Sequence, residues 1–212
     1  RFLSPDNLEY VKAIARFLKG RDKLMTRSYL WMGQKKCIRK ILNLATMLFP
    51  NSYLETKRIE ERYGFNVHCI TIPNGVDPEL FSFDERSEKD ECLVLCVARI
   101  EGIKNQINLI KALNNTRYSL LIIGSPAPNQ QSYYRECRRI AAPNIRFMEQ
   151  VDQSLLPFYY QRAKVHALPS WFEACGLSSL EASAMGCNIV ITDRGYTREY
   201  YEKYAFYCDP AS

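Results

Sequence analysis

The sequence ALPSWFEACGLSSLEASAMGCNIVITD, residues 167–193, decides the fold. An apolar run ends at the Pro169-Ser170 turn, a helical pattern begins at Gly176, and a second apolar run starts at Asn188. Short apolar runs on either side of a helical pattern are typical of a right-handed β-α-β unit, in which the two strands are parallel. This stretch therefore predicts part of a parallel sheet.

Two glutamates lie at the start of the helix in this stretch. Glu173 precedes Gly176 on the loop, and Glu181 follows inside the helix, with seven residues between the two glutamates. Free N–H groups at a helix N-terminus bind anions, whereas a carboxylate one turn further along suits neutral hydroxyls. Small residues surround Glu181, so its charge requires a partner. The combination predicts a phosphorylated sugar as ligand.

Composition indicates a folded protein with a sizeable core. The chain has 212 residues, of which 47% are hydrophobic. It contains no run of roughly 18 apolar residues and no signal-peptide pattern, so we expect a cytoplasmic protein. The eight cysteines include no C-x-x-C pair and there are only two histidines, so reduced thiols are favoured and no metal site is expected.

Positive charge is concentrated near the N-terminus. Residues 1–62 hold 14 Lys and Arg against 6 Asp and Glu, whereas the remainder holds 15 against 17. Two interpretations stay open: a solvated helix face, or a surface for an anionic membrane or an anionic acceptor. Nucleic acid is not expected as a partner, because the basic stretch lacks a recognisable reading motif.

Most of the N-terminal part is predicted to be helical. The expected elements are helices at residues 8–18, 29–49 and 53–63, and a strand at residues 67–72. Ser52 and Glu55 form a capping box before the third helix, and Gly64 closes it. Pro73-Asn74-Gly75 is a strong break, which divides the chain into residues 1–73 and 74–212.

The C-terminal part alternates between strands and helices. The expected strands are residues 92–98, 119–123, 145–148, 165–168 and 188–192, and the expected helices are residues 105–114, 130–141, 153–162 and 176–185. This alternation predicts an α/β fold with a parallel sheet covered by helices on both faces. Ligands of such sheets bind outside the carboxyl ends of the strands.

The residues at those strand ends suit a nucleotide sugar. Arg99 and Lys104 supply two cations for a diphosphate. Gly124 and Gly176 allow the backbone to approach a ligand closely. Glu181 suits vicinal hydroxyls such as those of ribose, and Glu173 the hydroxyls of a transferred sugar. Trp171 and Phe172, beside Glu173, are expected in the core.

Several motifs resemble a known family. They are Asn74-Gly75-Val76-Asp77, Val97-Ala98-Arg99 with Lys104-Asn105-Gln106, and Pro169-Ser170 with Glu173 and Glu181. In this order and spacing, over about residues 45–210, they resemble the retaining glycosyltransferases of family 4, which have the GT-B fold. In that family two Rossmann-like domains face each other, and the C-terminal one binds a nucleotide-diphosphate sugar without a metal.

The resemblance implies a role for each matching residue. Arg99 and Lys104 would bind the pyrophosphate, Glu181 the ribose, and Glu173 the donor sugar, with Arg99, Lys104 and Glu173 as the catalytic residues. The backbone at Ala174, Cys175, Gly176 and Leu177 would also contact the donor. Val151 would lie near the base, with Gly124 lining the donor site.

The same resemblance predicts the organisation of the whole protein. Residues 1–73 would be a remnant of the acceptor-side domain, and residues 74–212 a nucleotide-sugar-binding domain truncated at its C-terminus. We interpret the chain as a fragment, or the ordered part, of a longer enzyme, and we expect no sugar transfer from it alone. His68 and His166 lie in strand-like runs, so a structural role is expected for both.

The expected activity is that of a retaining hexosyltransferase in polysaccharide or glycolipid synthesis. Its acceptor would be a sugar or a lipid-linked molecule, with peripheral contact at the inner face of the membrane. Two alternatives stay open: a nucleotide-sugar-binding module without catalysis, and a membrane-surface adaptor acting through the basic N-terminal third. The nucleotide base, the sugar, the acceptor and the oligomeric state are open as well.

Overall fold

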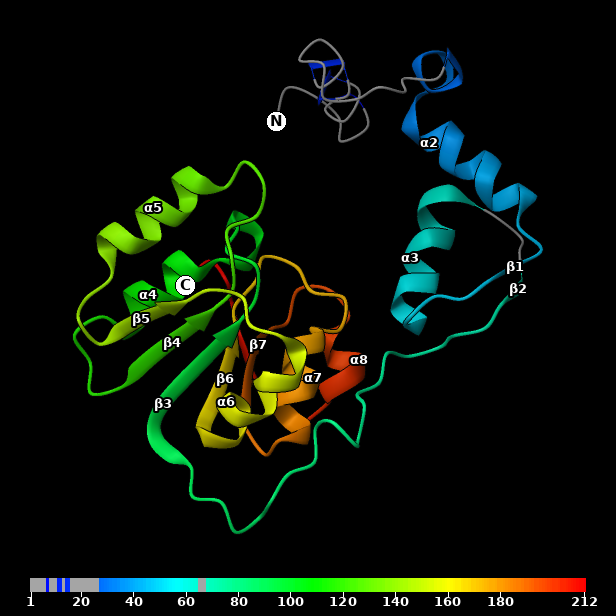
Figure 1. Cartoon of the computed structure of the whole chain (residues 1–212). Helices are drawn as coiled ribbons and strands as arrows, with labels where there is room; N and C mark the ends of the chain where they lie inside the picture. Colours follow the sequence, from blue (N-terminus) through cyan, green and yellow to red (C-terminus); the bar gives the residue numbers. More distant parts are fainter. Residues whose placement is uncertain (1–6, 8–10, 13, 16–26, 65–67) are drawn as a thin grey trace. The chain divides into compact units, whose positions relative to one another are not determined.

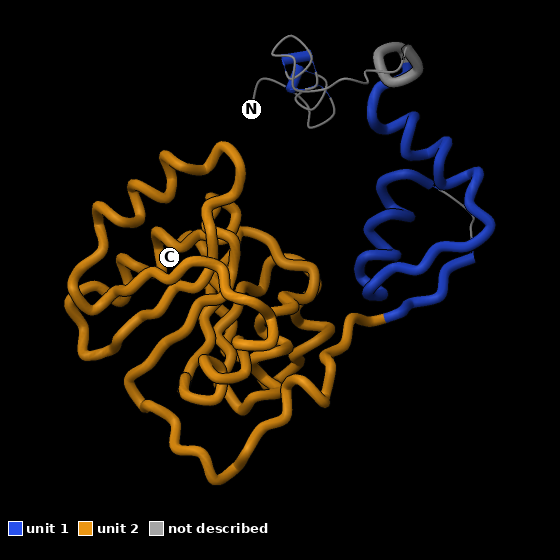
Figure 2. The backbone as a smooth tube through the Cα atoms, viewed as in Figure 1, with its two compact units in different colours: residues 1–72 blue, residues 73–212 orange. Residues whose placement is uncertain are grey.

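The chain forms two compact units, residues 1–72 and residues 73–212 (Figure 2). The computed structural model describes residues 27–64 and 68–212, together with residues 7, 11, 12, 14 and 15. Most of the predicted helix at residues 8–18, and the start of the strand predicted at residues 67–72, lie outside the described residues.

Between Arg27 and Cys69, the described part of the first unit has two helices and a small parallel sheet. Its described elements are α2 (Arg27–Leu44), β1 (Met47–Leu48), α3 (Tyr53–Tyr63) and β2 (His68–Cys69), and β1 pairs with β2. The helix predicted to reach residue 49 instead ends at Leu44. A short apolar run fits a strand as well as a helix end, so periodicity alone could not separate the two.

The capping box in front of α3 is confirmed. The backbone N–H of Glu55 donates to Ser52 Oγ at 3.0 Å, and the Glu55 carboxylate accepts from the N–H of Asn51 at 2.9 Å. At the other end Gly64 adopts a left-handed conformation, with φ at 58°, and donates to the carbonyl of Glu60. Local sequence therefore sets both ends of this helix.

The second unit is an α/β fold around a parallel sheet of six strands. Along the sheet the order is β5-β4-β3-β6-β7-β8. The strands are β3 (Asp90–Val97), β4 (Ser119–Ile123), β5 (Ile145–Met148), β6 (Ala163–Leu168), β7 (Asn188–Thr192) and β8 (Ala205–Cys208). Every neighbouring pair is parallel, which confirms the predicted sheet.

Helices cover both faces of this sheet (Figure 1). They are α4 (Gln106–Leu113), α5 (Gln131–Ile140), α6 (Leu156–Arg162), α7 (Leu177–Ala184) and α8 (Thr197–Tyr201), with single 3₁₀ turns η1 (Gly102–Lys104) and η2 (Gln153–Leu155). From β3 the chain moves outward through α4 and α5, and from β5 it returns through α6 to β6 and on to β8. Right-handed connections therefore place α4 and α5 on one face and α6, α7 and α8 on the other.

The reversal of direction between β3 and β6 positions the site. Loops that follow these two central strands leave in opposite directions, which opens a crevice at their carboxyl ends. Leu95 of β3, Leu168 of β6 and Ile191 of β7 are fully buried beneath it. The crevice therefore rests on a rigid, packed floor.

Two sequence expectations about side chains have different outcomes. All eight cysteines lie in the described ranges and are free thiols; the four in the second unit's interior, Cys96, Cys137, Cys175 and Cys187, are buried, and the other four are half-buried. The expectation that Trp171 and Phe172 lie in the core is wrong: Trp171 is 41% exposed, with the guanidinium of Arg194 5.4 Å from its ring, and Phe172 is half-buried. Among the described residues, no helix is long and apolar enough to cross a membrane.

Candidate functional site

Two adjoining cavities lie at the carboxyl ends of the central strands. The larger, about 670 Å³, is lined by Asn74, Lys104 and residues 173–178. The smaller, about 360 Å³, is lined by the apolar side chains of Ile123, Val151 and Leu156 and by several polar groups. Both share Arg99, Gln150 and Glu181, together with the end of β3. One elongated ligand could therefore occupy both cavities and pass Glu181.

Glu173 forms the charged centre of the larger cavity. The Lys104 ammonium lies 2.6 Å from Glu173 Oε1, and the Ser170 hydroxyl donates to the same oxygen at 2.6 Å. The side chains of Lys104 and Glu173 are 21% and 8% exposed. In such partial burial the pair keeps a defined geometry, and Glu173 Oε2 takes no part in either bond.

The backbone also holds Glu173 in place. Its N–H donates to the carbonyl of Arg194, and its carbonyl accepts from the N–H of Tyr196, each at 3.0 Å. Between these residues Gly195 has φ at 123°, and a Cβ built there would lie 1.8 Å from the Glu173 carbonyl oxygen. The loop after β7 therefore holds the Glu173 loop by two backbone hydrogen bonds. Only glycine can occupy position 195, because any side chain would collide with the Glu173 carbonyl.

Arg99 stands at the boundary of the two cavities. Its guanidinium lies 3.0 Å from the Glu101 carboxylate, and its side chain is 67% exposed. The side-chain amide of Gln106, a fully buried residue, donates to the Arg99 carbonyl at 2.9 Å. Arg99 thus has a fixed backbone and an accessible cationic end, which suits an anion entering from solvent.

The N-terminus of α7 faces the larger cavity. Gly176 caps the helix in a left-handed conformation, with φ at 72°, and Leu177 and Ser178 begin its first turn along the cavity wall. The first amides of a helix have no intrahelical acceptor, so their N–H groups are available to an anion. The Tyr201 hydroxyl donates to the Gly176 carbonyl at 3.1 Å and fixes this turn.

Glu181 meets two hydrogen-bond donors inside the site. Gln153 Nε2 donates to Glu181 Oε1 at 2.8 Å, and the Tyr160 hydroxyl donates to Oε2 at 2.9 Å. The expectation that this carboxylate needs partners is therefore confirmed. Tyr160 is fully buried, and burial together with Glu181 raises the pKa of its phenol, so the phenol remains a donor.

His166 is a structural residue beneath the site. It is fully buried, and its Nε2 accepts from the N–H of Val97 at 3.4 Å. Nδ1 therefore carries the proton and faces Ser179 Oγ at 3.1 Å. Burial lowers the pKa of His166 to about 3, so the ring is neutral. His68 instead is exposed, in β2 of the first unit.

The family of the chain follows from its C-terminal two thirds. Residues 77–212 match the family model described as Glycosyl transferases group 1. The chain belongs to this family. The group 1 glycosyltransferase match covers β3 to β8 and every strand end that lines the two cavities.

Two curated relatives match a longer part of the chain than the family model does. The chain is 27% identical over 177 residues to D-inositol 3-phosphate glycosyltransferase of Geodermatophilus obscurus. The aligned region covers 73% of this chain and 39% of that protein. A second such enzyme, from Catenulispora acidiphila, is 26% identical over 174 residues, 71% of this chain and 41% of that one. The chain thus spans about two fifths of the length of these curated relatives.

Solved structures agree with the fold of a group 1 glycosyltransferase. HepE from Anabaena, in complex with UDP-glucose, superposes with a TM-score of 0.75 at 18% identity, over 98% of this chain and 64% of that one. Sucrose-phosphate synthase from Thermosynechococcus elongatus gives 0.74 at 23% identity, over 90% and 52%. The second unit therefore has the Rossmann-like fold of the C-terminal half of GT-B glycosyltransferases.

Every site residue expected from the sequence motifs lines one or both cavities. Arg99 and Glu181 border both; the others are Lys104, Gly124, Val151, Glu173, Ala174, Cys175, Gly176 and Leu177. Their roles toward a ligand stay predictions. At Gly124, φ is 152° and an added Cβ would lie 2.0 Å from the Ala98 carbonyl oxygen. A side chain at position 124 would therefore collide with the end of β3, so glycine is required there.

Sequence reasoning missed several residues of the site. Asn74 lines the larger cavity and donates to Cys175 Sγ at 3.2 Å, and its position in the Asn-Gly-Val-Asp motif was an available signal. Ser170 also stands in a quoted motif. The contacts of Gln153 and Tyr160 with Glu181 had no local signal, because they join segments far apart along the chain.

Proposed function

We propose that this chain carries the donor site of a retaining glycosyltransferase of family 4. The enzyme would move a hexosyl group from a nucleotide-diphosphate sugar to an acceptor hydroxyl, in polysaccharide or glycolipid synthesis. The observation that carries the proposal is the position of Glu181, a carboxylate at the junction of a mainly apolar cavity and a polar one that is lined by Arg99, Lys104 and the start of α7. A nucleoside diphosphate has its ribose between an aromatic base and an anionic group, in the same order.

In this proposal each part of the donor has its own place. The base occupies the smaller cavity beside Val151 and Gly124, and the ribose hydroxyls bind Glu181. The diphosphate lies against Arg99, Lys104 and the first amides of α7. The sugar reaches the larger cavity, where its hydroxyls meet Glu173 and the backbone of residues 174–177.

The proposed chemistry depends on stabilising a leaving diphosphate. As the bond from the anomeric carbon to the phosphate oxygen breaks, its electron pair goes to that oxygen, and positive charge develops on the sugar ring. Arg99, Lys104 and the N–H groups of α7 are arranged to stabilise the new negative charge. Each well-placed donor of this kind contributes about 3 to 4 kcal/mol to catalysis.

Retention is proposed to follow from attack on the face that the diphosphate leaves. The acceptor oxygen forms the new bond there, and its proton passes to the leaving phosphate oxygen. A glutamate nucleophile is not required. The contacts of Glu173 support this, because Lys104 and Ser170 both hold its Oε1 and thereby reduce its nucleophilicity.

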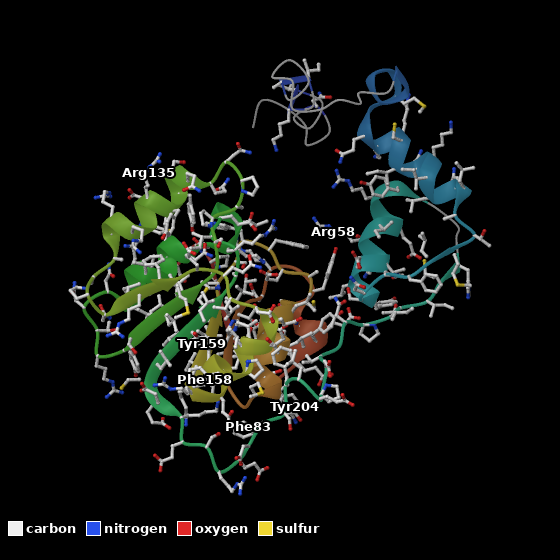
Figure 3. All side chains as sticks on the ribbon, in the orientation of Figure 1. Arg58, Phe83, Arg135, Phe158, Tyr159 and Tyr204 are labelled. Atoms are coloured by element: carbon white, nitrogen blue, oxygen red, sulfur yellow. The ribbon has the colours of Figure 1, made fainter. Side chains whose placement is uncertain are left out.

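We propose that the reaction needs no metal, since Arg99, Lys104 and a helix N-terminus supply the positive potential at the diphosphate. The residues that would hold the acceptor are proposed to belong to the domain of which the first unit is a part. Exposed basic side chains such as Arg58 of α3 belong to this unit (Figure 3). Relatives named for D-inositol 3-phosphate are consistent with an anionic acceptor.

Peripheral contact with an anionic membrane is proposed for the same basic unit. Sedimentation with phosphatidylserine vesicles at low salt tests it. Binding that disappears at high salt is expected, and no binding at low salt would remove this part of the proposal.

A ligand screen tests the proposal as a whole. Thermal unfolding is followed with UDP, GDP, ADP and their sugars, each with and without EDTA, because a ligand of the native state raises the midpoint. UDP comes first, since HepE has been solved with UDP and with UDP-glucose. We expect one nucleotide series to raise the midpoint equally in EDTA. No shift with any nucleotide would contradict the donor site, and a shift lost in EDTA would contradict the metal-free proposal.

A further inference from the structure

The Glu181 carboxylate is bonded on both oxygens before any ligand arrives. Gln153 supplies one donor to Oε1, and Tyr160 supplies one to Oε2. A carboxylate has about four acceptor positions, so each oxygen keeps one for a further hydrogen bond. Two vicinal hydroxyls could then bind side by side, one on each oxygen.

Tyr160 is held more firmly than its neighbours on α6. Phe158 is 59% exposed and Tyr159 is half-buried (both labelled in Figure 3), whereas Tyr160 is fully buried. The Tyr160 ring contacts two other rings, Phe81, with ring centres 6.1 Å apart, and His166, at 5.9 Å. Burial and these ring contacts restrict where its hydroxyl can lie.

The backbone of Tyr160 is fixed as well. Lys89 Nζ donates to the Tyr160 carbonyl at 3.1 Å, and the Cys187 thiol donates to the same oxygen at 3.1 Å. Ring and backbone are thus both anchored to the packed interior beneath the site. A donor fixed in this way can set the orientation of its acceptor, since the terminal torsion of a glutamate is otherwise broad.

We propose that Tyr160, assisted by Gln153, is a positioning residue that holds the Glu181 carboxylate ready for the vicinal hydroxyls of the ribose. The inference rests on the proposed function, because it requires that Glu181 bind ribose. Tyr160 does not touch the ligand: it acts by removing the need to order Glu181 on binding. Ordering a flexible side chain lowers affinity by about two- to tenfold.

The alternative is that Tyr160 is a core residue with a purely structural role, and that its hydrogen bond to Glu181 has no effect on ligand binding. Loss of a purely structural contact would lower the stability of the fold. It would not change how strongly the site prefers a ribose to a ribose that lacks its 2′ and 3′ hydroxyls. The discriminating quantity is therefore the ratio of affinities for a nucleoside diphosphate and for its 2′,3′-dideoxy analogue, measured by calorimetry on the whole chain.

The experiment compares wild type, Tyr160→Phe, Gln153→Leu and Tyr207→Phe. UDP, GDP and ADP are titrated first, and the tightest of them is then compared with its 2′,3′-dideoxy form. Tyr207→Phe is the matched control, because it removes a hydroxyl that donates to the Glu202 carbonyl at 2.9 Å and lines neither cavity. Gln153 is exposed, so its variant should fold even if Tyr160→Phe does not.

In Tyr160→Phe and in Gln153→Leu we expect the affinity for the nucleoside diphosphate to fall about threefold to tenfold. The affinity for the dideoxy form should stay as in wild type, and Tyr207→Phe should change neither. A wild-type affinity ratio in both site variants would overturn the inference and leave the proposed function intact. A wild type that binds no nucleotide, or binds both forms equally, would overturn the ribose site and the inference with it.

Discussion

Replacing Gly195 by alanine should displace the Glu173 loop. At the native backbone position the new Cβ would lie 1.8 Å from the Glu173 carbonyl oxygen, whereas real contacts of this kind stay beyond 3.0 Å. The two backbones must therefore separate by at least 1.2 Å, the difference between these distances. Such a shift breaks the hydrogen bonds of Glu173 with Arg194 and Tyr196.

The expected loss of stability follows from these contacts. Two backbone hydrogen bonds contribute about 1 kcal/mol each. An alanine held at a φ of 123° adds strain of about 1 to 2 kcal/mol. Gly195→Ala should therefore lower the free energy of unfolding by about 3 to 4 kcal/mol. Affinity for the nucleotide sugar should fall by about tenfold, the cost of one lost hydrogen bond from a charged group.

Urea unfolding and calorimetry with the nucleotide sugar measure the two effects. Gly75→Ala is the control, because nothing lies within 4 Å of a Cβ added there, and its stability should change by less than about 1 kcal/mol. If Gly195→Ala had the same free energy of unfolding and the same affinity for the nucleotide sugar as Gly75→Ala, the reasoning about the backbone contact between Gly195 and Glu173 would be refuted.

Two further predictions concern the buried ring of His166 and the half-buried ammonium of Lys89. Because the pKa of His166 is lowered to about 3 by burial, only the unfolded state takes up its proton below about pH 6.5. The contribution of His166 to the free energy of unfolding should fall by about 2 kcal/mol between pH 7.5 and pH 5. Urea unfolding should show this decrease in wild type and not in His166→Gln. An equal decrease in both proteins would contradict the assignment of the pH dependence to His166. Lys89 Nζ lies 2.9 to 3.2 Å from four backbone carbonyl oxygens at and just beyond the C-terminal ends of α6 and α7, and these oxygens share its three N–H donors. Lys89→Met should lower the free energy of unfolding by about 2 to 3 kcal/mol, whereas Lys164→Met, which loses an exposed ion pair, should lower it by under about 1 kcal/mol; equal losses would refute the distinction.

Local pattern was sufficient for most of the second unit. The strands predicted at residues 119–123, 145–148 and 188–192 have the bounds of β4, β5 and β7. Short apolar runs that alternate with helical patterns are compatible with few folds other than a parallel sheet covered by helices, so the alternation alone predicts the parallel sheet. The final pair, α8 and β8, was missed because a helix of five residues is too short to show a period.

The sequence predicted which charged residues line the two cavities, and their roles toward a ligand stay predictions. Arg99, Lys104, Glu173 and Glu181 were expected there because the carboxyl ends of parallel strands meet. What could not be predicted is how these groups pair. The 2.6 Å contact of Lys104 with Glu173 joins residues assigned to different parts of the ligand, and it depends on tertiary packing.

Packing also explains the errors. Trp171 looked like core because it is large and follows a buried strand, yet it lies outside, next to the Arg194 guanidinium. The end of α2 was placed too late, since the preference of Met47 and Leu48 for a strand depends on β2, which lies beyond α3. Neither partner is visible in a local window of sequence.

Calorimetric titration of wild type and Glu181→Gln with the nucleoside diphosphate tests the central claim most directly. Glutamine retains the length and an acceptor for the Tyr160 hydroxyl, so the fold should be kept while the charge that binds ribose hydroxyls is removed. We predict binding to wild type and about tenfold weaker binding to the variant. Equal affinity of the two proteins would contradict the assignment of Glu181 to the ribose, and with it the donor site proposed here.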